Sequence, residues 1–205
     1  HIARLNAKGS RMSETFVRQV FAGVCGGIRE VHANKLLHLD LKPANIYLRT
    51  DGTPIILDFG AARQTINKDV PKLTPMYTPG FAPPDLYSKT ASLGPWSDIY
   101  SIGASMFACM AGSPPQPADQ RRLEDRMENQ YAKLGDYSPQ LVNLVRWCLD
   151  MDPLARPQSV FAVQKELQAA PPAAVPATAE KSGALRGLAE KLGVFGRKKA
   201  ADKNS

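Results

Sequence analysis

The sequence has little cysteine and no apolar run long enough to cross a lipid bilayer. Its three cysteines are odd in number and lack metal-ligand spacing, which argues against a secreted disulfide scaffold and a cysteine-based metal site. The most apolar stretch, residues 99–111, falls short of the ~20 residues that a membrane-spanning helix needs. No secretory signal is visible at the N-terminus. We therefore expect a cytoplasmic protein in which residues 99–111 form a buried core helix.

Excess charge is also scarce over most of the chain, although the net charge is +7. Residues 177–205 contain seven basic and three acidic residues, a net charge of +4, which leaves +3 for the rest. A mildly basic main part gives no reason to expect a nucleic-acid partner. The length of 205 residues is enough for one domain with a sizeable core.

One dense polar motif is present: HLDLKPAN at residues 38–45, followed by a DFG that begins at Asp58. Asp40 can orient the proton of an attacking hydroxyl, and Lys42 can reach a transferring phosphate as a point charge. The side-chain amide oxygen of Asn45 and the carboxylate of Asp58 suit Mg²⁺, a hard cation that prefers oxygen ligands. The motif therefore predicts Asp40 and Lys42 as catalytic residues, Asn45 and Asp58 as Mg²⁺ ligands, and Lys42, Asn45 and Asp58 as the groups that bind Mg²⁺-bound ATP, Lys42 through its phosphate.

The segment inside this motif has the pattern of a β-hairpin. Two apolar runs, residues 46–48 and 55–57, flank the turn sequence TDGT at residues 50–53. An Asp-Gly turn between apolar runs is a strong local signal for a hairpin.

In this arrangement the chain resembles the C-terminal lobe of a protein kinase of the bacterial serine/threonine type. The family patterns HRDLKxxN and DFG match residues 38–45 and 58–60. The resemblance covers about residues 1–167 and implies a mainly α fold with a short catalytic-loop β-hairpin. Three later motifs follow in the family's order: TPGFAPPD at 78–85, WSDIYSIG at 96–103 and DPLARP at 152–157.

The resemblance implies roles for residues in these later motifs. The hydroxyl of Thr78 would bridge the catalytic acid and lysine, which makes Thr78 a third catalytic candidate. Asp98 would anchor the backbone of the catalytic loop, and Arg156 would pair with Asp85, which replaces the family's usual glutamate. Tyr47 would lie near the adenine of ATP. Lys42 in the catalytic loop (residues 38–45), together with Thr78, favours a serine/threonine kinase over a tyrosine kinase.

Two features depart from the family. Leu39 occupies the position of the HRD arginine, which in many kinases binds a phosphorylated residue of the activation segment (here residues 61–82). Because leucine cannot do this, we expect activity that does not depend on phosphorylation of that segment. No Gly-rich loop, strand lysine or helix with the partner glutamate precedes residue 38. The N-terminal lobe is thus missing from this sequence. We expect a piece of a longer kinase or a truncated product, with little or no kinase activity alone.

Three functions stay open at this point. The first is an ATP-dependent protein serine/threonine kinase that acts on hydroxyls of protein substrates. The second is a catalytically incomplete, pseudokinase-like scaffold or interaction module. The third is a small-molecule phosphotransferase. The third function is disfavoured by the presence of Thr78, Pro84-Asp85 and Arg156. In the family, residues at these positions build a platform for a polypeptide substrate.

The chain organisation predicts a catalytic-domain portion at residues 1–168, a Pro/Ala-rich linker at 169–182 and a basic tail at 183–205. The tail has apolar residues at helical spacing beside basic ones, which suits weak, peripheral contact with an anionic membrane. Its four glycines favour a disordered, solubilising tail instead. Within the domain, periodicity predicts helices at 13–33, 121–133, 138–149 and 158–168, with a loop at 112–120. The pattern does not indicate an oligomeric state.

Overall fold

The computed structural model describes residues 11–64, 78–88 and 90–169. The predicted linker beyond residue 169, the basic tail and most of the activation segment therefore lie outside the described residues. Within the described ranges the chain is mainly helical with two small antiparallel pairings, which confirms the predicted fold class.

The first described helix, α2 (Glu14–Ala33), begins and packs as its sequence predicts. Ser13 is the N-cap, and its hydroxyl accepts a hydrogen bond from the backbone N–H of Phe16 at 3.3 Å. One apolar side of the helix is buried, including Val17, Phe21 and Ile28. This side packs on α3 and α7.

The apolar stretch that starts near residue 99 lies in α3 (Pro95–Ala111). Every residue from 97 to 110 is buried, and the helix ends at Gly112, whose φ of +77° suits glycine. The prediction of a core helix is therefore confirmed. Among the described residues, no helix is both long and apolar enough to cross a membrane.

The segment after α3 differs from the prediction. Residues 121–133 do not form one helix, and the expected loop at 112–120 ends early, because α4 already begins at Ala118. A non-helical stretch at residues 122–126 separates α4 from α5, and the Asp125 carboxylate accepts the N–H of Met127 at the start of α5. The other helices of the described residues are η1 (Pro43–Asn45), η2 (Pro84–Tyr87), α4 (Ala118–Arg121), α5 (Met127–Tyr131), η3 (Ala132–Leu134), α6 (Pro139–Cys148) and α7 (Val160–Gln168).

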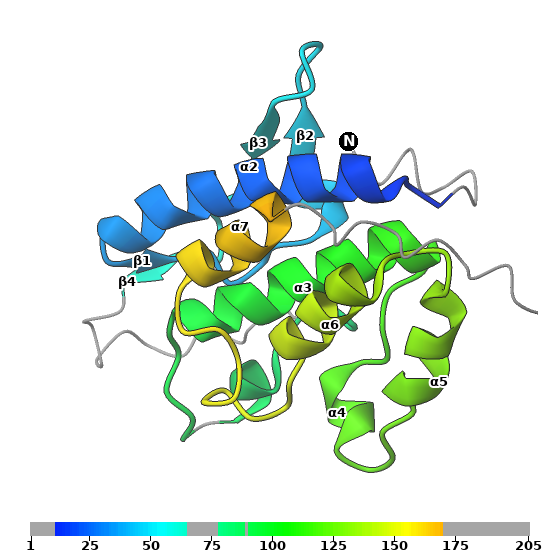
Figure 1. Cartoon of the computed structure of the whole chain (residues 1–205). Coiled ribbons are helices and arrows are strands. Elements are labelled where there is room, and N and C mark those ends of the chain that lie inside the picture. Colours follow the sequence, from blue (N-terminus) through cyan, green and yellow to red (C-terminus); the bar gives the residue numbers. More distant parts are fainter. Residues whose placement is uncertain (1–10, 65–77, 89, 170–205) are drawn as a thin grey trace, which may run out of the picture. The chain divides into compact units, whose positions relative to one another are not determined.

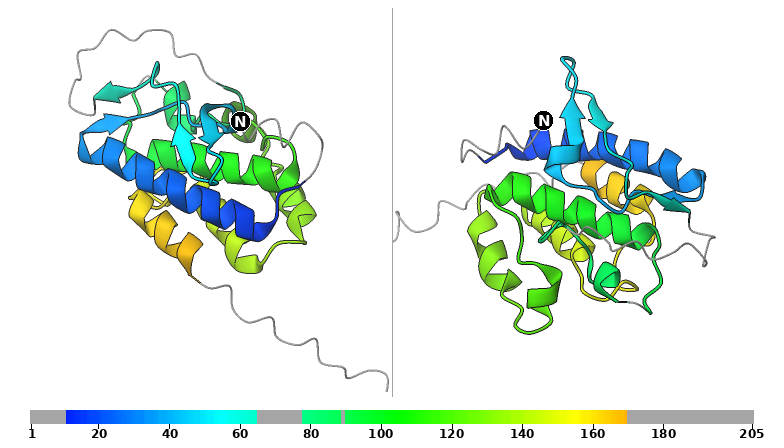
Figure 2. Two further views of the ribbon diagram at one scale, coloured as in Figure 1. Left: turned by 90° about the horizontal axis from the view of Figure 1, so that it is seen from above. Right: turned by 180° about the vertical axis from the view of Figure 1, so that it is seen from behind.

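The predicted hairpin is present and projects beyond α2, on the side opposite α3 and α6 (Figure 1). Strand β2 (Ile46–Leu48) pairs antiparallel with β3 (Pro54–Ile56), and Ile46 stands opposite Ile56. The turn needs Gly52, whose φ is +85°. The view from behind, on the right of Figure 2, shows the same projection of the hairpin.

A second pairing, between β1 (Leu36–Leu37) and β4 (Arg63–Gln64), was not predicted from the sequence. It joins the strand that enters the catalytic loop to the strand that follows Gly60. Each strand has only two residues, too few for an alternating pattern to be visible.

Three helices meet at a partly buried cluster of polar side chains, called here the three-helix joint. Arg18 of α2 pairs with Glu14 at 2.8 Å, and Glu14 also accepts the hydroxyl and the backbone N–H of Ser138, the N-cap of α6. The Arg18 guanidinium also donates to backbone carbonyls at the C-terminal end of α7, those of Glu166, Leu167 and Ala169. Since these carbonyls have no partner within their own helix, the joint ties the ends of α6 and α7 to α2.

The cysteines behave as small hydrophobic residues. Cys25, Cys109 and Cys148 are free and buried. Burial raises the pKa of the Cys25 thiol to about 12 and also raises that of Cys148. Neither thiol is therefore a reactive thiolate near neutral pH.

Candidate active site

The catalytic loop is held from behind by one buried carboxylate. Asp98 of α3 accepts the backbone N–H of His38 at 2.9 Å and that of Leu39 at 2.8 Å. Its side chain is fully buried. This is the anchoring contact that the resemblance implied for Asp98.

His32 adds a third hydrogen bond to this carboxylate, and sequence reasoning missed it. The Nε2 of His32 lies 2.8 Å from Oδ2 of Asp98. Because a carboxylate oxygen can only accept, the ring N–H is the donor. No local signal marks His32, since its partner lies 66 residues further along the chain.

Leu39 stands where the family has arginine and adopts a left-handed backbone with φ of +64°. Its side chain is buried, in the part of the loop that lies beside Phe81 and Ala82. This backbone region costs a non-glycine residue about 1–2 kcal/mol. The hydrogen bond from Leu39 N–H to Asp98 helps to hold it there.

His38 connects the catalytic loop to the DFG segment. Its Nδ1 accepts the backbone N–H of Asp40 at 3.3 Å, so the proton lies on Nε2, which donates to the carbonyl of Leu57 at 3.3 Å. Its ring packs on that of Phe59 with centroids 4.8 Å apart. His38 therefore packs against the DFG segment and has a structural role.

Four predicted site residues meet in one closed hydrogen-bond network. Asp40 Oδ2 accepts from Lys42 Nζ at 2.8 Å and from Asn45 Nδ2 at 3.2 Å. Asp40 Oδ1 accepts the Thr78 hydroxyl at 3.1 Å. Lys42 Nζ also donates to Thr78 Oγ1 at 2.9 Å. Thr78, 38 residues from Asp40, thus lies between the acid and the lysine.

Asn45 and Asp58 lie at the two ends of the hairpin. Asn45 comes directly before β2, and Asp58 follows β3 by two residues. The backbone N–H of Leu57 donates to the carbonyl of Asn45 at 2.8 Å, which closes the hairpin at its base. Asp58 adopts φ of +62°, and its Oδ1 accepts the N–H of Gly60 at 3.1 Å.

These two side chains fit a magnesium ion by their chemistry. The Asn45 amide uses its NH₂ group toward Asp40, through the backbone carbonyl at 2.9 Å and the carboxylate. Within the described residues, no hydrogen bond engages Asn45 Oδ1 or Asp58 Oδ2. Both are oxygen atoms that can bind a metal ion. Mg²⁺ in phosphate-binding sites usually takes only one or two protein ligands beside water and phosphate. No group of three or more acidic, His or Cys residues suited to a metal occurs in the described part of the chain.

Large apolar side chains are exposed beside this hairpin. Tyr47 on β2, Leu57 and Phe59 show 43%, 38% and 46% of their surface. Tyr47 stands opposite Ile55 on β3. Exposed apolar surface of this kind commonly marks a place where a ligand or another segment packs. The adenine contact of Tyr47 stays a prediction.

The segment after Thr78 is fastened to the core by polar contacts. The Ser101 hydroxyl of α3 donates to the carbonyl of Phe81 at 2.9 Å. Further along, Asp85 and Arg156 form a two-pronged pair with both N–O distances at 3.0 Å, which confirms the predicted pairing. Both side chains are almost completely buried. The Ser97 hydroxyl donates to the same carboxylate at 2.8 Å, a contact that the sequence analysis missed.

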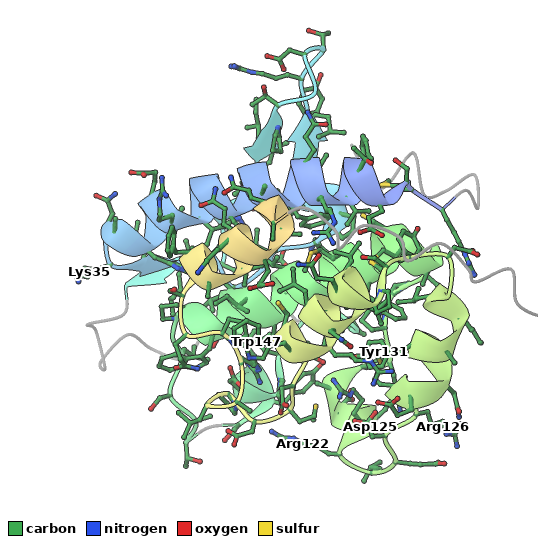
Figure 3. The ribbon with its side chains drawn as sticks, in the orientation of Figure 1. Lys35, Arg122, Asp125, Arg126, Tyr131 and Trp147 are labelled. Atoms are coloured by element: carbon green, nitrogen blue, oxygen red, sulfur yellow. The ribbon has the colours of Figure 1, made fainter. Side chains whose placement is uncertain are left out.

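A cavity of about 480 Å³ lies elsewhere, between α5 and α6. Its two arginines pair with acidic residues: Arg121 with Asp125 at 2.8 Å, and Arg146 with Glu128. Arg146 also lies 4.3 Å over the ring of Tyr131. Figure 3 shows Asp125 and Tyr131 on this side, near α4 and α5. None of the motif residues 38–60 lines this cavity, so the candidate active site is the catalytic loop.

Comparison with known proteins agrees with the geometry. A family model described as "Protein kinase domain" matches residues 1–167. Serine/threonine-protein kinase 16 of Homo sapiens is 27% identical over 188 residues, which cover 84% of this chain and 62% of the human protein. Serine/threonine-protein kinase PknA of Nostoc sp. is 34% identical over 123 residues, 56% of this chain and 21% of that protein.

A yeast relative shows the same partial coverage. The cell cycle serine/threonine-protein kinase CDC5/MSD2 of Saccharomyces cerevisiae is 30% identical over 151 residues, 71% of this chain and 21% of the yeast protein. The chain therefore spans less than two thirds of the length of each of these relatives. Because the family model covers nearly all of the described residues, including the network around Asp40, this chain belongs to the protein kinase family.

Proposed function

We propose that this chain supplies the hydroxyl-activating and metal-binding part of an ATP-dependent protein serine/threonine kinase. The observation that carries the proposal is the closed network of Asp40, Lys42, Thr78 and Asn45. A protein that only binds partners has no chemical need to keep an acid, an amine, an amide and a hydroxyl within hydrogen-bond distance of one another.

Asp40 is the group that orients the substrate hydroxyl. Its side chain keeps 17% of its surface open and that of Lys42 keeps 23%, so both are accessible from solvent. Asp40 accepts the hydroxyl proton as the hydroxyl oxygen bonds to the transferred phosphorus and the bond to the leaving phosphate breaks. Lys42 neutralises the charge on the transferred group while it keeps Asp40 in place.

Asn45 Oδ1 and the Asp58 carboxylate are the groups that would hold Mg²⁺. When bound, the ion would neutralise charge on the phosphates of ATP. The exposed apolar side chain of Tyr47, on the strand that starts beside Asn45, lies on the hairpin where the nucleotide base is expected.

Two observations support a Ser/Thr hydroxyl of a protein as the acceptor. Thr78 reaches both Asp40 and Lys42, and the segment that follows it is fastened to the core at Phe81 and Asp85. This gives an anchored surface beside the acid, which suits a polypeptide better than a small molecule. The three relatives above carry the name serine/threonine-protein kinase.

The test compares Asp40→Asn with Asp51→Asn in the protein at its full natural length. Asp51 is a carboxylate at the hairpin turn, where it accepts the N–H of Thr53 and has no contact with the network. We expect Asp40→Asn to lower phosphate transfer from ATP to a Ser/Thr peptide by about 10²–10⁴-fold, the usual range for a lost acid–base group. Nucleotide binding, measured by calorimetry, stays in place, and Asp51→Asn behaves as wild type.

Retained turnover in Asp40→Asn would show that Asp40 does not orient the hydroxyl. A wild-type protein that neither binds nucleotide nor transfers phosphate would overturn the kinase proposal and point to a scaffold role.

A further inference from the structure

Two glycines of α2 face the hairpin so closely that an added Cβ atom would be crowded at either position. A Cβ atom on Gly23 would lie 2.6 Å from Cγ and 2.9 Å from Cδ of Pro54 on β3. A Cβ on Gly27 would lie 3.1 Å from Cδ1 of Ile56 on the same strand. The two glycines are four residues apart, so they lie on one face of the helix.

This close approach explains why glycine stands at both positions. Glycine is the least favourable residue in a helix interior after proline. Gly23 and Gly27 are also exposed, so crowding in the protein core does not require them. The contacts with Pro54 and Ile56 are what a side chain would disturb. A proline ring cannot swing aside as a long side chain can, because its Cδ is bonded to the backbone nitrogen.

The hairpin that rests on these glycines carries both predicted metal ligands. Asn45 directly precedes β2, and Asp58 follows β3 by two residues. Ile56 pairs with Ile46, and Leu57 N–H donates to the carbonyl of Asn45. The body of the hairpin projects away from the other helices, so its contact with the core lies at its base on α2 (Figures 1 and 2). A shift of β3 relative to α2 therefore moves Asp58 relative to the loop anchored by Asp98.

We propose that Gly23 and Gly27 are positioning residues for the metal site. They set how closely β3 lies on α2, and thereby where the Asp58 carboxylate lies relative to Asn45. This inference rests on the proposed function, because it assigns Asn45 and Asp58 to Mg²⁺. It predicts that a methyl group on this face of α2 weakens metal binding without touching any ligand.

The test uses Gly23→Ala, with Gly26→Ala as the matched control, in the protein at full natural length. Gly26 lies in the same helix, but its Cβ would meet only Gln164 of α7 at an ordinary 3.6 Å. The measurement is Mn²⁺ binding in the presence of ADP, followed by electron paramagnetic resonance, together with the Mg²⁺ dependence of phosphate transfer. We expect Gly23→Ala to weaken Mn²⁺ binding about tenfold, or 1.4 kcal/mol. Gly26→Ala should bind like wild type.

A rescue variant separates positioning from simple damage to the helix. Pro54→Ala removes the Cγ and Cδ atoms that Gly23→Ala would meet. The double variant Gly23→Ala/Pro54→Ala should therefore recover most of the lost Mn²⁺ affinity. In Gly23→Ala the half-maximal Mg²⁺ concentration should rise while kcat at saturating Mg²⁺ stays near wild type. That split is not expected from a general loss of stability.

A milder pair keeps the test decisive if Gly23→Ala does not fold. Gly27→Ala requires Ile56 to move only slightly, and Ile56→Val removes the contacting Cδ1. The same weakening and the same rescue are expected, on a smaller scale. Unchanged Mn²⁺ affinity in the folded glycine variant, or a loss that the matching second substitution does not rescue, would overturn the inference. Absence of Mn²⁺ binding by wild type would instead overturn the proposed function and this inference with it.

Discussion

Two sets of polar contacts hold the candidate active site, and they differ in burial. Behind the catalytic loop and the segment after Thr78, the side chains of Asp98, Asp85 and Arg156 are at most 1% exposed. In the site itself, Asp40 and Lys42 keep 17% and 23% of their side-chain surface open. Groups in the buried set cannot turn to water when a partner is lost, whereas groups in the open set can. The buried contacts should therefore determine stability, and the open contacts turnover.

The largest expected effect on stability is at Arg156. Its guanidinium pairs with Asp85 through two hydrogen bonds and also donates to the carbonyls of Trp96, Asp150 and Met151. Arg156→Ala leaves the buried Asp85 charge without its partner, which costs about 3–5 kcal/mol. Urea denaturation should show a lower midpoint at an unchanged slope.

Arg126→Ala is the matched control for this comparison. Arg126 pairs with Glu124 at the surface beside α5, with both side chains more than 60% exposed (Figure 3). We expect its denaturation midpoint to equal that of wild type. An Arg156→Ala protein as stable as Arg126→Ala would contradict the distinction between buried and open contacts.

The next effect is at Asp98, where stability and turnover should fall together. Asp98→Asn replaces one acceptor oxygen by an NH₂ group, so at least one donor among His38 N–H, Leu39 N–H and the His32 ring loses its partner. A buried unsatisfied donor costs about 1–3 kcal/mol. His32→Phe removes only the ring donor and should lie between wild type and Asp98→Asn in both measurements. Full turnover in Asp98→Asn would show that this anchor does not position Asp40.

Thr78 provides the opposite case, a change in turnover alone. Thr78→Val keeps the shape but removes the hydroxyl that connects Asp40 and Lys42. We expect phosphate transfer to fall about tenfold or more, since a hydrogen bond to a charged group contributes about 1.5–3 kcal/mol. The free energy of unfolding should change by less than about 0.5 kcal/mol. Thr78→Ser restores the hydroxyl and should restore turnover; a destabilised Thr78→Val would count against this division of roles.

The smallest effect is a pH-dependent one at the three-helix joint. Partial burial alone would raise the pKa of Glu14, but hydrogen bonds from Ser138 and Arg18 outweigh it and lower that pKa below the ordinary 4.5. A lowered folded-state pKa contributes stability above the ordinary value, and this contribution is lost as the pH falls through the folded-state pKa. The melting temperature of wild type should exceed that of Glu14→Gln near pH 7, and the difference should shrink below about pH 4.5. A difference independent of pH would exclude this linkage.

Local patterns were enough to predict much of the fold. The capped helix that starts after Ser13, the core helix α3 and the hairpin around Gly52 follow from periodicity, capping and turn chemistry. The prediction was wrong where such signals are weak. Residues 121–133 have helical spacing, but the chain leaves the helix after α4 and resumes at α5. The β1–β4 pairing was missed because two-residue strands carry no alternation.

The candidate site, like the fold, was predicted from the sequence only in part. The motif at residues 38–60 and its family resemblance named every member of the Asp40 network before its geometry was known. Sequence reasoning missed His32, Ser97 and the two α2 glycines, whose partners lie in other elements of the fold, 12 residues away for Ser97 and 66 for His32. Their roles depend on which elements pack together, and no spacing within their own segment reports that.

The sequence by itself determined the chemical groups available: an acid, an amine, an amide and a second acid within 19 residues, and glycines spaced for one helix face. Only the tertiary structure decided how these groups meet. It brings Thr78 to Asp40, Asp98 behind His38 and Arg156 to Asp85 across separations of 38 to 71 residues. The physical reason is that burial of the apolar faces of α2, α3, α6 and α7 fixes their packing. The polar contacts then form wherever that packing places their partners.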